Sequence, residues 1–296
     1  MGRLDGRVAV VTGSGRGIGA GIAKLFAAEG AKVVVNDLGA SVDGTGADVG
    51  PAQQVVEEIT ANGGEAIVNG GDVSDYDSAG ELVHSAIDAF GKLDILVNVA
   101  GILRDRMLVN MTPDEWNAVL NVHLTGTFNT SKHAAVYWRE HRGEGQYRLI
   151  NFTSAAGLFG SPGQPNYAAA KLGIVGFTLS CANALNRYGV TSNAIAPGAA
   201  TRMTMSIPPE RAAEMGVDLR GMEPEAVAYP VAYIASEESS WLNGRVVGAQ
   251  GGKLTLYENY HPEQAVSSVE PWTIETIFEQ MPKTFHPDRQ GLAGMG

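Results

Sequence analysis

Two side chains that can exchange a proton lie four residues apart in the middle of the chain. Tyr167 and Lys171 fall on one face of a predicted helix, because four residues make about one turn. A phenol has a pKa of about 10, so it acts as a base near neutral pH only where a positive charge stabilises the phenolate. Lys171 can supply that charge, and Ser154, 13 residues before Tyr167, can hold the same substrate oxygen. Taken alone, this spacing also fits ordinary surface or core residues.

A glycine-rich turn follows the first predicted strand and opens a helix. Its residues are Thr12, Gly13, Ser14, Gly15, Arg16, Gly17, Ile18 and Gly19. Glycine allows a tight turn and lets the backbone approach a pyrophosphate, whose charge then lies at the N-terminus of the helix. A strand-to-helix turn that binds no ligand can have a similar composition. The context, with Asp37 at the end of the second predicted strand, favours a dinucleotide site.

Asp37 indicates which dinucleotide to expect. It lies 18 residues after Gly19, where a carboxylate can accept hydrogen bonds from the adenosine ribose hydroxyls. The carboxylate would repel the additional phosphate of NADP, whereas Arg16 could neutralise that phosphate or simply face solvent. Asp37 carries more weight, since a fixed carboxylate acts on affinity directly and Arg16 can swing away. The predicted cofactor is NAD, whose oxidised nicotinamide would help Lys171 to stabilise the Tyr167 phenolate.

Short runs rich in valine and isoleucine alternate with longer stretches of helical spacing, which predicts repeated βαβ units. The predicted fold class is α/β, a doubly wound parallel sheet of Rossmann type. Strands are expected at residues 8–11, 32–35, 66–68, 95–97, 149–152 and 192–196. Helices are expected at residues 17–28, 52–61, 79–90, 113–139, 167–187 and 224–235, with the fourth broken in two near Val122.

We predict a single domain, residues 1–252, followed by a C-terminal extension, residues 253–296. Residues 38–50 are crowded with Gly, Asp, Ser and Thr and are expected to form a surface loop. In the extension the apolar rhythm thins, although residues 271–281 could form one more helix. Such a segment is usually a surface wrap or a subunit arm and less often a substrate lid.

Composition limits the partners and the compartment. The 32 acidic and 21 basic residues give a formal net charge of -11, which argues against nucleic acid or an anionic membrane as a partner. Cys181 is the one cysteine, so an internal disulfide and a multi-cysteine metal site are excluded, and no metal is expected. No export signal and no uninterrupted apolar stretch of about 20 residues is evident, which favours a cytoplasmic protein.

Together these motifs resemble those of the short-chain dehydrogenase/reductase family over residues 3–252. The resemblance rests on segments in the family's order, namely 12–19, 72–73, 98–101, Ser154, 167–171 and 197–198. It implies an oxidoreductase that interconverts a secondary alcohol and a ketone, with Ser154, Tyr167 and Lys171 as catalytic residues.

The resemblance also assigns residues to the cofactor. Asp72 and Val73 would contact adenine, residues 98–101 would line the adenosine side, and residues 197–201 would meet the nicotinamide carboxamide. The predicted set is Gly13, Ser14, Arg16, Gly17, Ile18, Gly19, Asp37, Leu38, Asp72, Val73, Asn98, Ala100, Gly101, Tyr167, Lys171, Pro197, Gly198 and Thr201. A plainer interpretation of each is a loop or strand-end residue that satisfies backbone groups.

Two departures from the family pattern are informative. Val99 stands where the family usually has a second asparagine, which removes one polar side chain without touching the chemistry. His123 stands where most members have a catalytic-helix asparagine that holds a water between Lys171 and solvent. Imidazole both donates and accepts, so His123 could take over this relay, or it could only fill the kink between two helices.

The surroundings of His123 indicate a branch of the family. Residues 36–39, 100–106, 123–124 and 196–204, with the loop at 38–50, are similar to the (3R)-hydroxyacyl-CoA dehydrogenase domain of peroxisomal multifunctional enzyme type 2 and its actinobacterial relatives. This implies NAD-dependent oxidation of a 3-hydroxyacyl-CoA, with bulky or sterol-derived acyl groups among the candidates, to the 3-ketoacyl-CoA. Arg104, Arg106 and Arg202 could meet CoA phosphates or form ordinary surface ion pairs.

Three other functions compete with this hypothesis. One is an NADPH-dependent 3-oxoacyl reductase, and another is a dehydrogenase of hydroxysteroids or terpene alcohols. A third is a non-catalytic dinucleotide-binding sensor, against which the intact Ser154, Tyr167 and Lys171 argue. For assembly, the resemblance implies a homodimer or homotetramer in which the helices around 113–139 and 167–187 pair across a two-fold axis.

Overall fold

The computed structural model describes residues 2–198, 223–262, 264–269 and 271–285. The chain divides into two units, Met1–Tyr257 and Glu258–Gly296. The division predicted after residue 252 falls inside the first unit, because Lys253–Tyr257 is a strand of its sheet. Thr201 and Arg202, named above for the cofactor and for CoA, lie outside the described residues.

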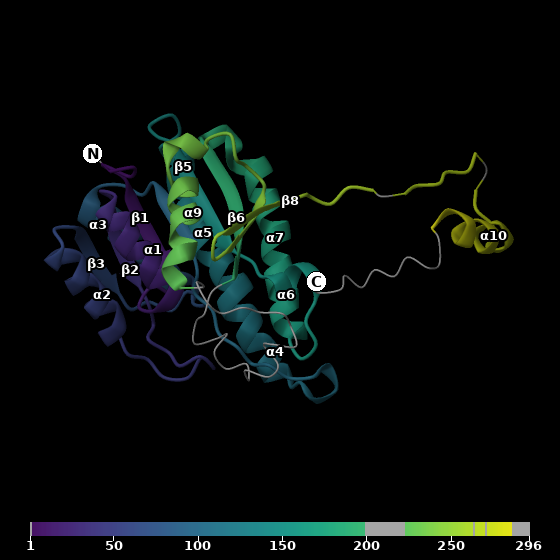
Figure 1. The fold of residues 1–296 in the computed structure, drawn as a ribbon, viewed down its shortest axis with the longest axis horizontal. Coiled ribbons are helices and arrows are strands. Elements are labelled where there is room, and N and C mark those ends of the chain that lie inside the picture. The colour runs from purple at the N-terminus through teal and green to yellow at the C-terminus, as the bar shows by residue number, and fades with distance from the viewer. Residues whose placement is uncertain (1, 199–222, 263, 270, 286–296) are drawn as a thin grey trace. The chain divides into compact units, whose positions relative to one another are not determined.

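The first unit is built on one sheet with the strand order β3-β2-β1-β4-β5-β6-β7-β8 (Figure 1). Its strands are β1 Val8–Thr12, β2 Lys32–Asn36, β3 Glu65–Asn69, β4 Ile95–Asn98, β5 Tyr147–Phe152, β6 Val190–Gly198, β7 Val246–Gln250 and β8 Lys253–Tyr257. All neighbours are parallel except β7 and β8. This confirms the predicted doubly wound sheet of Rossmann type, to which the structure adds β7 and β8, two strands that the sequence pattern did not predict.

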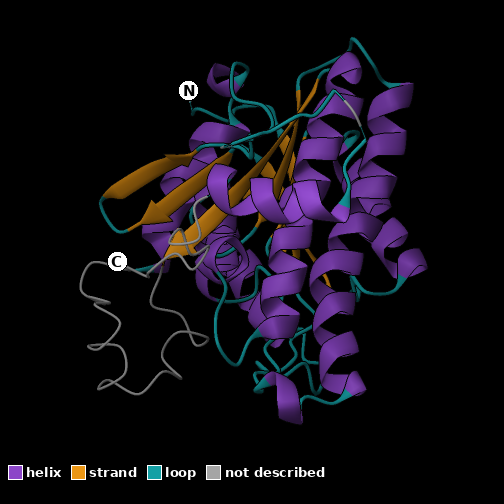
Figure 2. Ribbon diagram, turned by 90° about the vertical axis from the view of Figure 1, so that its right-hand side faces the viewer, coloured by secondary structure: helices purple, strands orange, loops and turns teal. Residues whose placement is uncertain are grey.

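Helices cover both faces of this sheet (Figure 2). They are α1 Gly17–Ala28, α2 Gly50–Ala61, α3 Tyr76–Phe90, α4 Pro113–Leu120, α5 Gly126–Glu140, α6 Ala155–Phe159, α7 Pro165–Leu185 and α9 Pro224–Ala235, with single turns η1 Leu108–Asn110, η3 Asn186–Tyr188 and η4 Glu237–Ser239. Successive side chains of a strand point to opposite faces. Accordingly, Ala9 and Val11 of β1 pack with α1, α2 and α9, while Val8 and Val10 pack with α3 and α5.

The predicted break near Val122 is confirmed. After α4 the chain makes one wide turn of π type, η2 Asn121–Thr125, before α5 continues. A π turn inserts a residue into the helix and is common at functional sites. His123 lies in this turn and is buried.

The segments predicted as irregular are partly confirmed. Residues 38–50 form a loop as expected, and α2 begins at its last residue. In the second unit, α10 Ile274–Thr284 is the additional helix, shifted by one turn from the predicted 271–281. Thr273 caps it, since its hydroxyl accepts from the backbone N–H of Thr276.

One helix is longer and more apolar than the sequence reading allowed. The helix at residues 165–188 is 24 residues long and contains an 18-residue stretch with a mean hydropathy of 1.4, enough in length and composition to cross a membrane. This helix packs on β6, α4 and α6, and its buried residues include Asn166 and Lys171. Burial of Ala170, Ile174 and Val175 in the first unit accounts for part of its apolar character, since a third of the apolar stretch is buried.

Candidate active site

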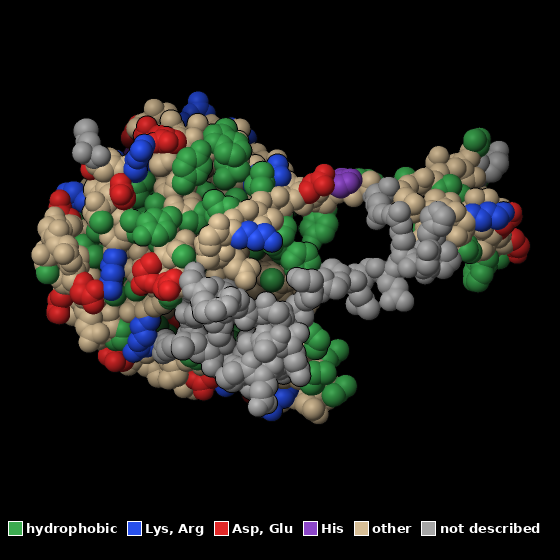
Figure 3. Space-filling model, in the orientation of Figure 1, with side chains coloured by type: hydrophobic (Ala, Val, Ile, Leu, Met, Phe, Trp, Pro, Cys, Tyr) green, Lys and Arg blue, Asp and Glu red, His purple; other side chains and the backbone are tan. Residues whose placement is uncertain are grey.

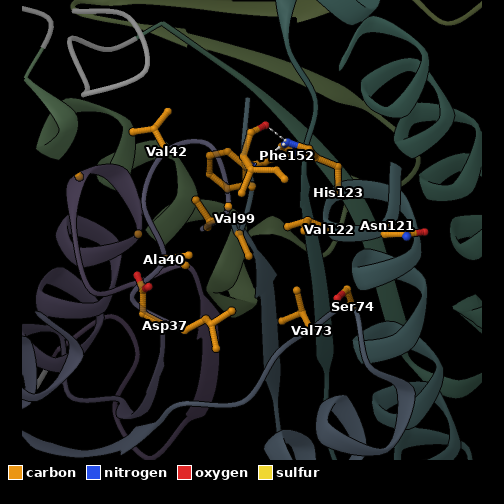
Figure 4. A pocket seen from close by; sticks show the side chains of 18 of the residues that line it. Asp37, Ala40, Val42, Val73, Ser74, Val99, Asn121, Val122, His123 and Phe152 are labelled. Carbon is orange, nitrogen blue, oxygen red and sulfur yellow. Dashed lines mark hydrogen bonds between the residues drawn. The ribbon is translucent and has the colours of Figure 1, made fainter. Parts of the chain in front are cut away.

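A cavity of about 520 Å³ opens beside the turn after β1 and the segment after β4. From β1 the sheet continues to β2 and β3 on one side and to β4 and β5 on the other. Ligands of open α/β sheets bind at such a switch point. Asp37 lies at one end of the cavity and His123 at the other (Figure 4). Most predicted site residues line it, namely Gly13, Arg16, Gly17, Ile18, Gly19, Asp37, Leu38, Asp72, Val73, Ala100, Gly101, His123, Tyr167, Lys171 and Pro197.

Two glycines of the glycine-rich turn stand where a side chain has no room. Gly13 has a φ of 62°, and a Cβ there would lie 2.7 Å from the Cα of Ala100. A Cβ on Gly19 would collide with the carbonyl of Gly13. The turn is thus closed on itself and against the segment after β4, and it forms a backbone-walled cradle at the start of α1. This fits the pyrophosphate of a dinucleotide.

Asp37 is fixed by the backbone on both of its oxygens. Oδ2 accepts a 2.8 Å hydrogen bond from the N–H of Gly15, and Oδ1 accepts one of 2.7 Å from Gly39. The carboxylate therefore holds the glycine-rich turn to the start of the 38–50 loop. It presents a fixed negative charge at the end of β2, as the sequence led us to expect.

Three described residues of the predicted set do not line the cavity with the others. Ser14 is buried, and its hydroxyl donates to the carbonyls of Val11 and Asn36, so it joins strands instead. Asn98 accepts from Thr130 and donates to the side chain of Asn151 across the sheet. Gly198 packs closely on Gln250 of β7, whose side chain a Cβ would meet at 2.7 Å.

The 38–50 loop contributes more to the cavity than the sequence indicated. Ala40, Ser41, Val42, Asp43 and Gly44 all line it. The N–H of Leu103 donates to the carbonyl of Val42 at 2.9 Å, and a Cβ on Gly44 would lie 2.9 Å from Ile102. A glycine-rich and aspartate-rich stretch directly after Asp37 was the available signal, but only its contact with the segment after β4 gives it a place at the site.

The predicted catalytic residues converge from three elements. Tyr167 and Lys171 lie on α7, with the Nζ of Lys171 5.6 Å from the centre of the Tyr167 ring. That Nζ donates a 2.7 Å hydrogen bond to the carbonyl of Phe152, the last residue of β5. Ser154 follows β5 directly and lies within hydrogen-bonding reach of the Tyr167 phenol. Ser154 is not among the residues that line the cavity, although its phenol partner is.

Burial sets the charge of these groups. Lys171 is 4% exposed, and burial lowers the pKa of its ammonium group to about 7. Burial also raises the pKa of the Tyr167 phenol to about 12, an effect that the hydrogen bond with Ser154 opposes. A phenol of this pKa needs a further positive charge nearby before it can act as a base at neutral pH. The sequence interpretation assigns that charge to an oxidised nicotinamide.

His123 is held by the backbone of the segment after β4. Its Nε2 lies 2.8 Å from the oxygen and 3.1 Å from the nitrogen of Ile102, while its buried Nδ1 has no hydrogen-bond partner among the described residues. Burial, with the charge of Lys171, holds the pKa of His123 well below its usual 6.5. The imidazole is therefore neutral at pH 7, and its ring meets Tyr167 edge-on at 5.1 Å.

The two described arginines named for CoA differ. Arg106 is exposed and forms an ion pair of 3.1 Å with Glu115, which is the ordinary surface role. Arg104 lines the cavity. Hydrogen bonds from Thr45 lower the pKa of the Asp43 carboxyl in the loop, and the charge of Arg104 adds a smaller effect in the same direction. Arg104 is thus the arginine whose position fits a ligand phosphate.

We expect Lys171→Met to stabilise the fold while abolishing activity. A lysine whose folded pKa lies near 7 must lose its proton on folding at any pH between 7 and its ordinary 10.5. The penalty is full below pH 7 and fades as the pH approaches 10.5, so the gain from Lys171→Met, a few kcal/mol near neutral pH, should shrink in the same direction. Urea denaturation at neutral pH and at a pH about two units higher measures this gain in stability.

The control for this prediction is Lys24→Met. The side chain of Lys24 is 42% exposed, so no comparable gain is expected. A gain for Lys171→Met that does not change with pH would contradict the role given to the buried charge.

Comparison with known proteins identifies the family that shares this architecture. Residues 7–212 match the family described as short chain dehydrogenase. The chain is similar to a solved structure of a short chain dehydrogenase from Mycobacterium avium, with 44% identity, a TM-score of 0.86 and 98% coverage of each chain. Relatives include "Hydroxyacyl-CoA dehydrogenase ChsB1" of Mycobacterium tuberculosis, 42% identical over 90% of this chain and 84% of that protein.

Two further relatives carry different names. "Peroxisomal multifunctional enzyme type 2" of Drosophila melanogaster is 42% identical over 93% of this chain, which spans 44% of that longer protein. A "3-oxoacyl-[acyl-carrier-protein] reductase" of Synechocystis is 41% identical over 86% of this chain and 99% of that protein. The family match and these identities agree with the glycine cradle and the Ser154, Tyr167 and Lys171 cluster. The chain belongs to the short-chain dehydrogenase/reductase family of oxidoreductases, which bind a nicotinamide dinucleotide.

Proposed function

We propose that this protein is an NAD-dependent dehydrogenase that oxidises a 3-hydroxyacyl-CoA, with bulky or sterol-derived acyl groups in its range, to the 3-ketoacyl-CoA. The observation that carries the proposal is a single cavity that joins the Asp37 carboxylate at one end to Tyr167, Lys171 and His123 at the other. The name of the mycobacterial relative, a hydroxyacyl-CoA dehydrogenase, supports an acyl-CoA substrate. Arg104 at the cavity offers a charge for a CoA phosphate.

In this reaction the chain's own residues hold the alcohol and move its proton. When bound, the oxidised nicotinamide would take the hydride and bring a positive charge into the pocket. The Ser154 hydroxyl would hold the substrate oxygen, and the Tyr167 phenolate would accept the hydroxyl proton as the carbonyl forms. Lys171, anchored on the Phe152 carbonyl, would stabilise the phenolate.

His123 would complete the path of that proton to solvent. In the tautomer that donates from Nε2 to the carbonyl of Ile102, Nδ1 carries a lone pair and no proton. Because the ring is neutral, Nδ1 can accept a hydrogen bond from a water that also contacts Lys171. This supports a relay role for His123, beside its evident role in holding the segment after β4.

Two observations keep an alternative in view. Arg16 lines the cavity beside Asp37 and could meet the 2′-phosphate of NADP, and a 3-oxoacyl reductase is among the relatives. An NADPH-dependent reductase acting on 3-oxoacyl groups is therefore the second candidate. A hydroxysteroid or terpene-alcohol dehydrogenase is a third candidate, because Ser154, Tyr167 and Lys171 would act on any secondary alcohol in the same way.

We expect NAD to be preferred over NADP, because the Asp37 carboxylate would face a 2′-phosphate in a partly desolvated pocket. Asp37→Asn keeps one side-chain oxygen as an acceptor and removes the charge. This variant should lower the ratio of kcat/KM for NAD to kcat/KM for NADP by about ten-fold or more, which corresponds to a loss of about 1.4 kcal/mol in discrimination between the two cofactors. Arg16→Ala in the same background should restore part of the preference. A wild-type enzyme that turns over NADP as well as NAD would refute the assignment.

The substrate assignment is tested by NAD reduction across a panel of 3-hydroxyacyl-CoAs, hydroxysteroids and small secondary alcohols. We expect the highest kcat/KM with a 3-hydroxyacyl-CoA. Tyr167→Phe should lower turnover of that substrate by roughly 100- to 10,000-fold and leave NAD affinity intact, because it removes only the proton carrier. Substantial activity in Tyr167→Phe, or a free sterol as the best substrate, would overturn the mechanism or the substrate class, respectively.

We also propose a homodimer or homotetramer. Phe128 of α5 and Leu172 of α7 are large apolar residues that are 46% and 39% exposed, on the helices expected to pair. Tyr229, Tyr233 and Trp241 add a second apolar patch, and hydrophobic side chains gather over α9 (Figure 3). Two such patches suit two interfaces of a tetramer.

Sedimentation at micromolar concentration should show a dimer or tetramer. Phe128→Glu should shift the distribution toward smaller species, because it places a charge in the apolar contact. A wild-type monomer would contradict the proposal.

A further inference from the structure

Asn166, the residue before the catalytic tyrosine, is completely buried. α7 begins at Pro165, so Tyr167 lies in its first turn, where backbone N–H groups have no acceptor within the helix. The preceding residue, Gln164, makes no side-chain capping bond. The Oδ1 of Asn166 supplies the acceptor, with a hydrogen bond of 2.8 Å from the N–H of Tyr167.

The other end of the same amide reaches two further segments. Its Nδ2 donates to the carbonyl of Arg104 at 3.0 Å and to that of Glu115 in α4 at 3.1 Å. Both N–H groups of the amide therefore donate, and its oxygen accepts, within the protein. One side chain therefore ties the backbone of Tyr167 to α4 and to the segment after β4.

That segment also holds His123. Ile102 bonds the imidazole through its backbone, Arg104 bonds Asn166, and Leu103 between them bonds Val42 of the loop beside the cavity. Residues 102 and 104, in one short stretch of backbone, therefore hold His123 and Asn166. Asn166 in turn holds Tyr167, so this common support sets the 5.1 Å edge contact between the rings of His123 and Tyr167.

We propose that Asn166 is a positioning residue for proton transfer, which acts through Tyr167 and holds its phenol in register with His123 and Lys171. It does not touch the reacting atoms. The inference needs only that the protein oxidises an alcohol through Tyr167, and in that respect it rests on the proposed function. Displacement of a reacting group by about 1 Å can cost about 100-fold in rate, so loss of this amide should act on kcat.

A buried asparagine can also be purely structural, and the chain offers a matched control. Asn193 of β6 is likewise fully buried, its Nδ2 donates to the carbonyl of Leu242 at 2.8 Å, and its Oδ1 accepts from the N–H of Arg245. It lines no part of the cavity in the described residues. Asn193→Ala therefore removes a comparable set of hydrogen bonds away from the reacting groups.

The test compares Asn166→Ala with Asn193→Ala at a temperature well below both melting points. Asn166→Ala should lower kcat by about ten-fold or more while the Kd for NAD changes by less than about three-fold, and Asn193→Ala should lose a similar amount of Tm but keep kcat. If Asn166→Ala does not fold, Asn166→Ser retains a hydroxyl that can donate to one of the two carbonyls, and it should show a smaller loss of kcat. Unchanged kcat in the folded Asn166 variant, or an equal loss in Asn193→Ala, would overturn the proposal.

A second readout needs no substrate. With fluorotyrosine in place of the nine tyrosines, the fluorine resonance of Tyr167 is assigned by its loss in Tyr167→Phe. Asn166→Ala should shift and narrow this resonance, because the ring gains freedom, while Asn193→Ala should leave it in place. A panel without any active substrate combined with a shifted resonance would refute the proposed function and keep the positioning role. An unshifted resonance would refute the positioning role itself.

Discussion

The ammonium group of Lys171 lies in a place that water hardly reaches, and its 2.7 Å hydrogen bond to the carbonyl of Phe152 constrains much of the surrounding structure. A buried lysine keeps its charge only at a high cost in solvation. The local fit is correspondingly tight. Thr153 donates to the carbonyl of Lys171, and a Cβ on Gly157 would lie 2.7 Å from the lysine Cβ. The end of β5, α6 and α7 must therefore stay together for this one amino group to remain in place.

Below the cavity, a row of buried hydrogen bonds fixes the same helices to the sheet. Asn98 of β4 bonds Asn151 of β5, which donates to Thr178 of α7, while Thr130 of α5 donates to Asn98. Buried amides are costly unless they are satisfied, so such a row permits few alternative arrangements. This explains why Asn98, expected beside the adenosine, has its side chain committed to the core instead.

The parallel core could be predicted from sequence because its valine-rich runs are buried on both faces, as in β1 and β4. β8 escaped prediction because its side chains are mostly exposed, and its pairing with β7 rather than its own pattern makes it a strand. At the site, Tyr167 and Lys171 could be predicted from the sequence because their chemistry requires a fixed spacing within one helix. The roles of Asn166 and Val42 could not be predicted, since each depends on a contact between segments far apart in the sequence.

His123 and Gly101 illustrate how one departure from a family pattern constrains another position. A Cβ on Gly101 would occupy the space of the imidazole ring, so a residue with any side chain there would displace His123. The wide turn of η2 carries the ring toward the segment after β4, where the backbone of Ile102 binds Nε2. A histidine in this turn therefore requires glycine at 101 and backbone groups at 102 that face the ring. The proposed relay and the proposed support of Tyr167 thus both depend on the segment after β4, which also walls the cavity.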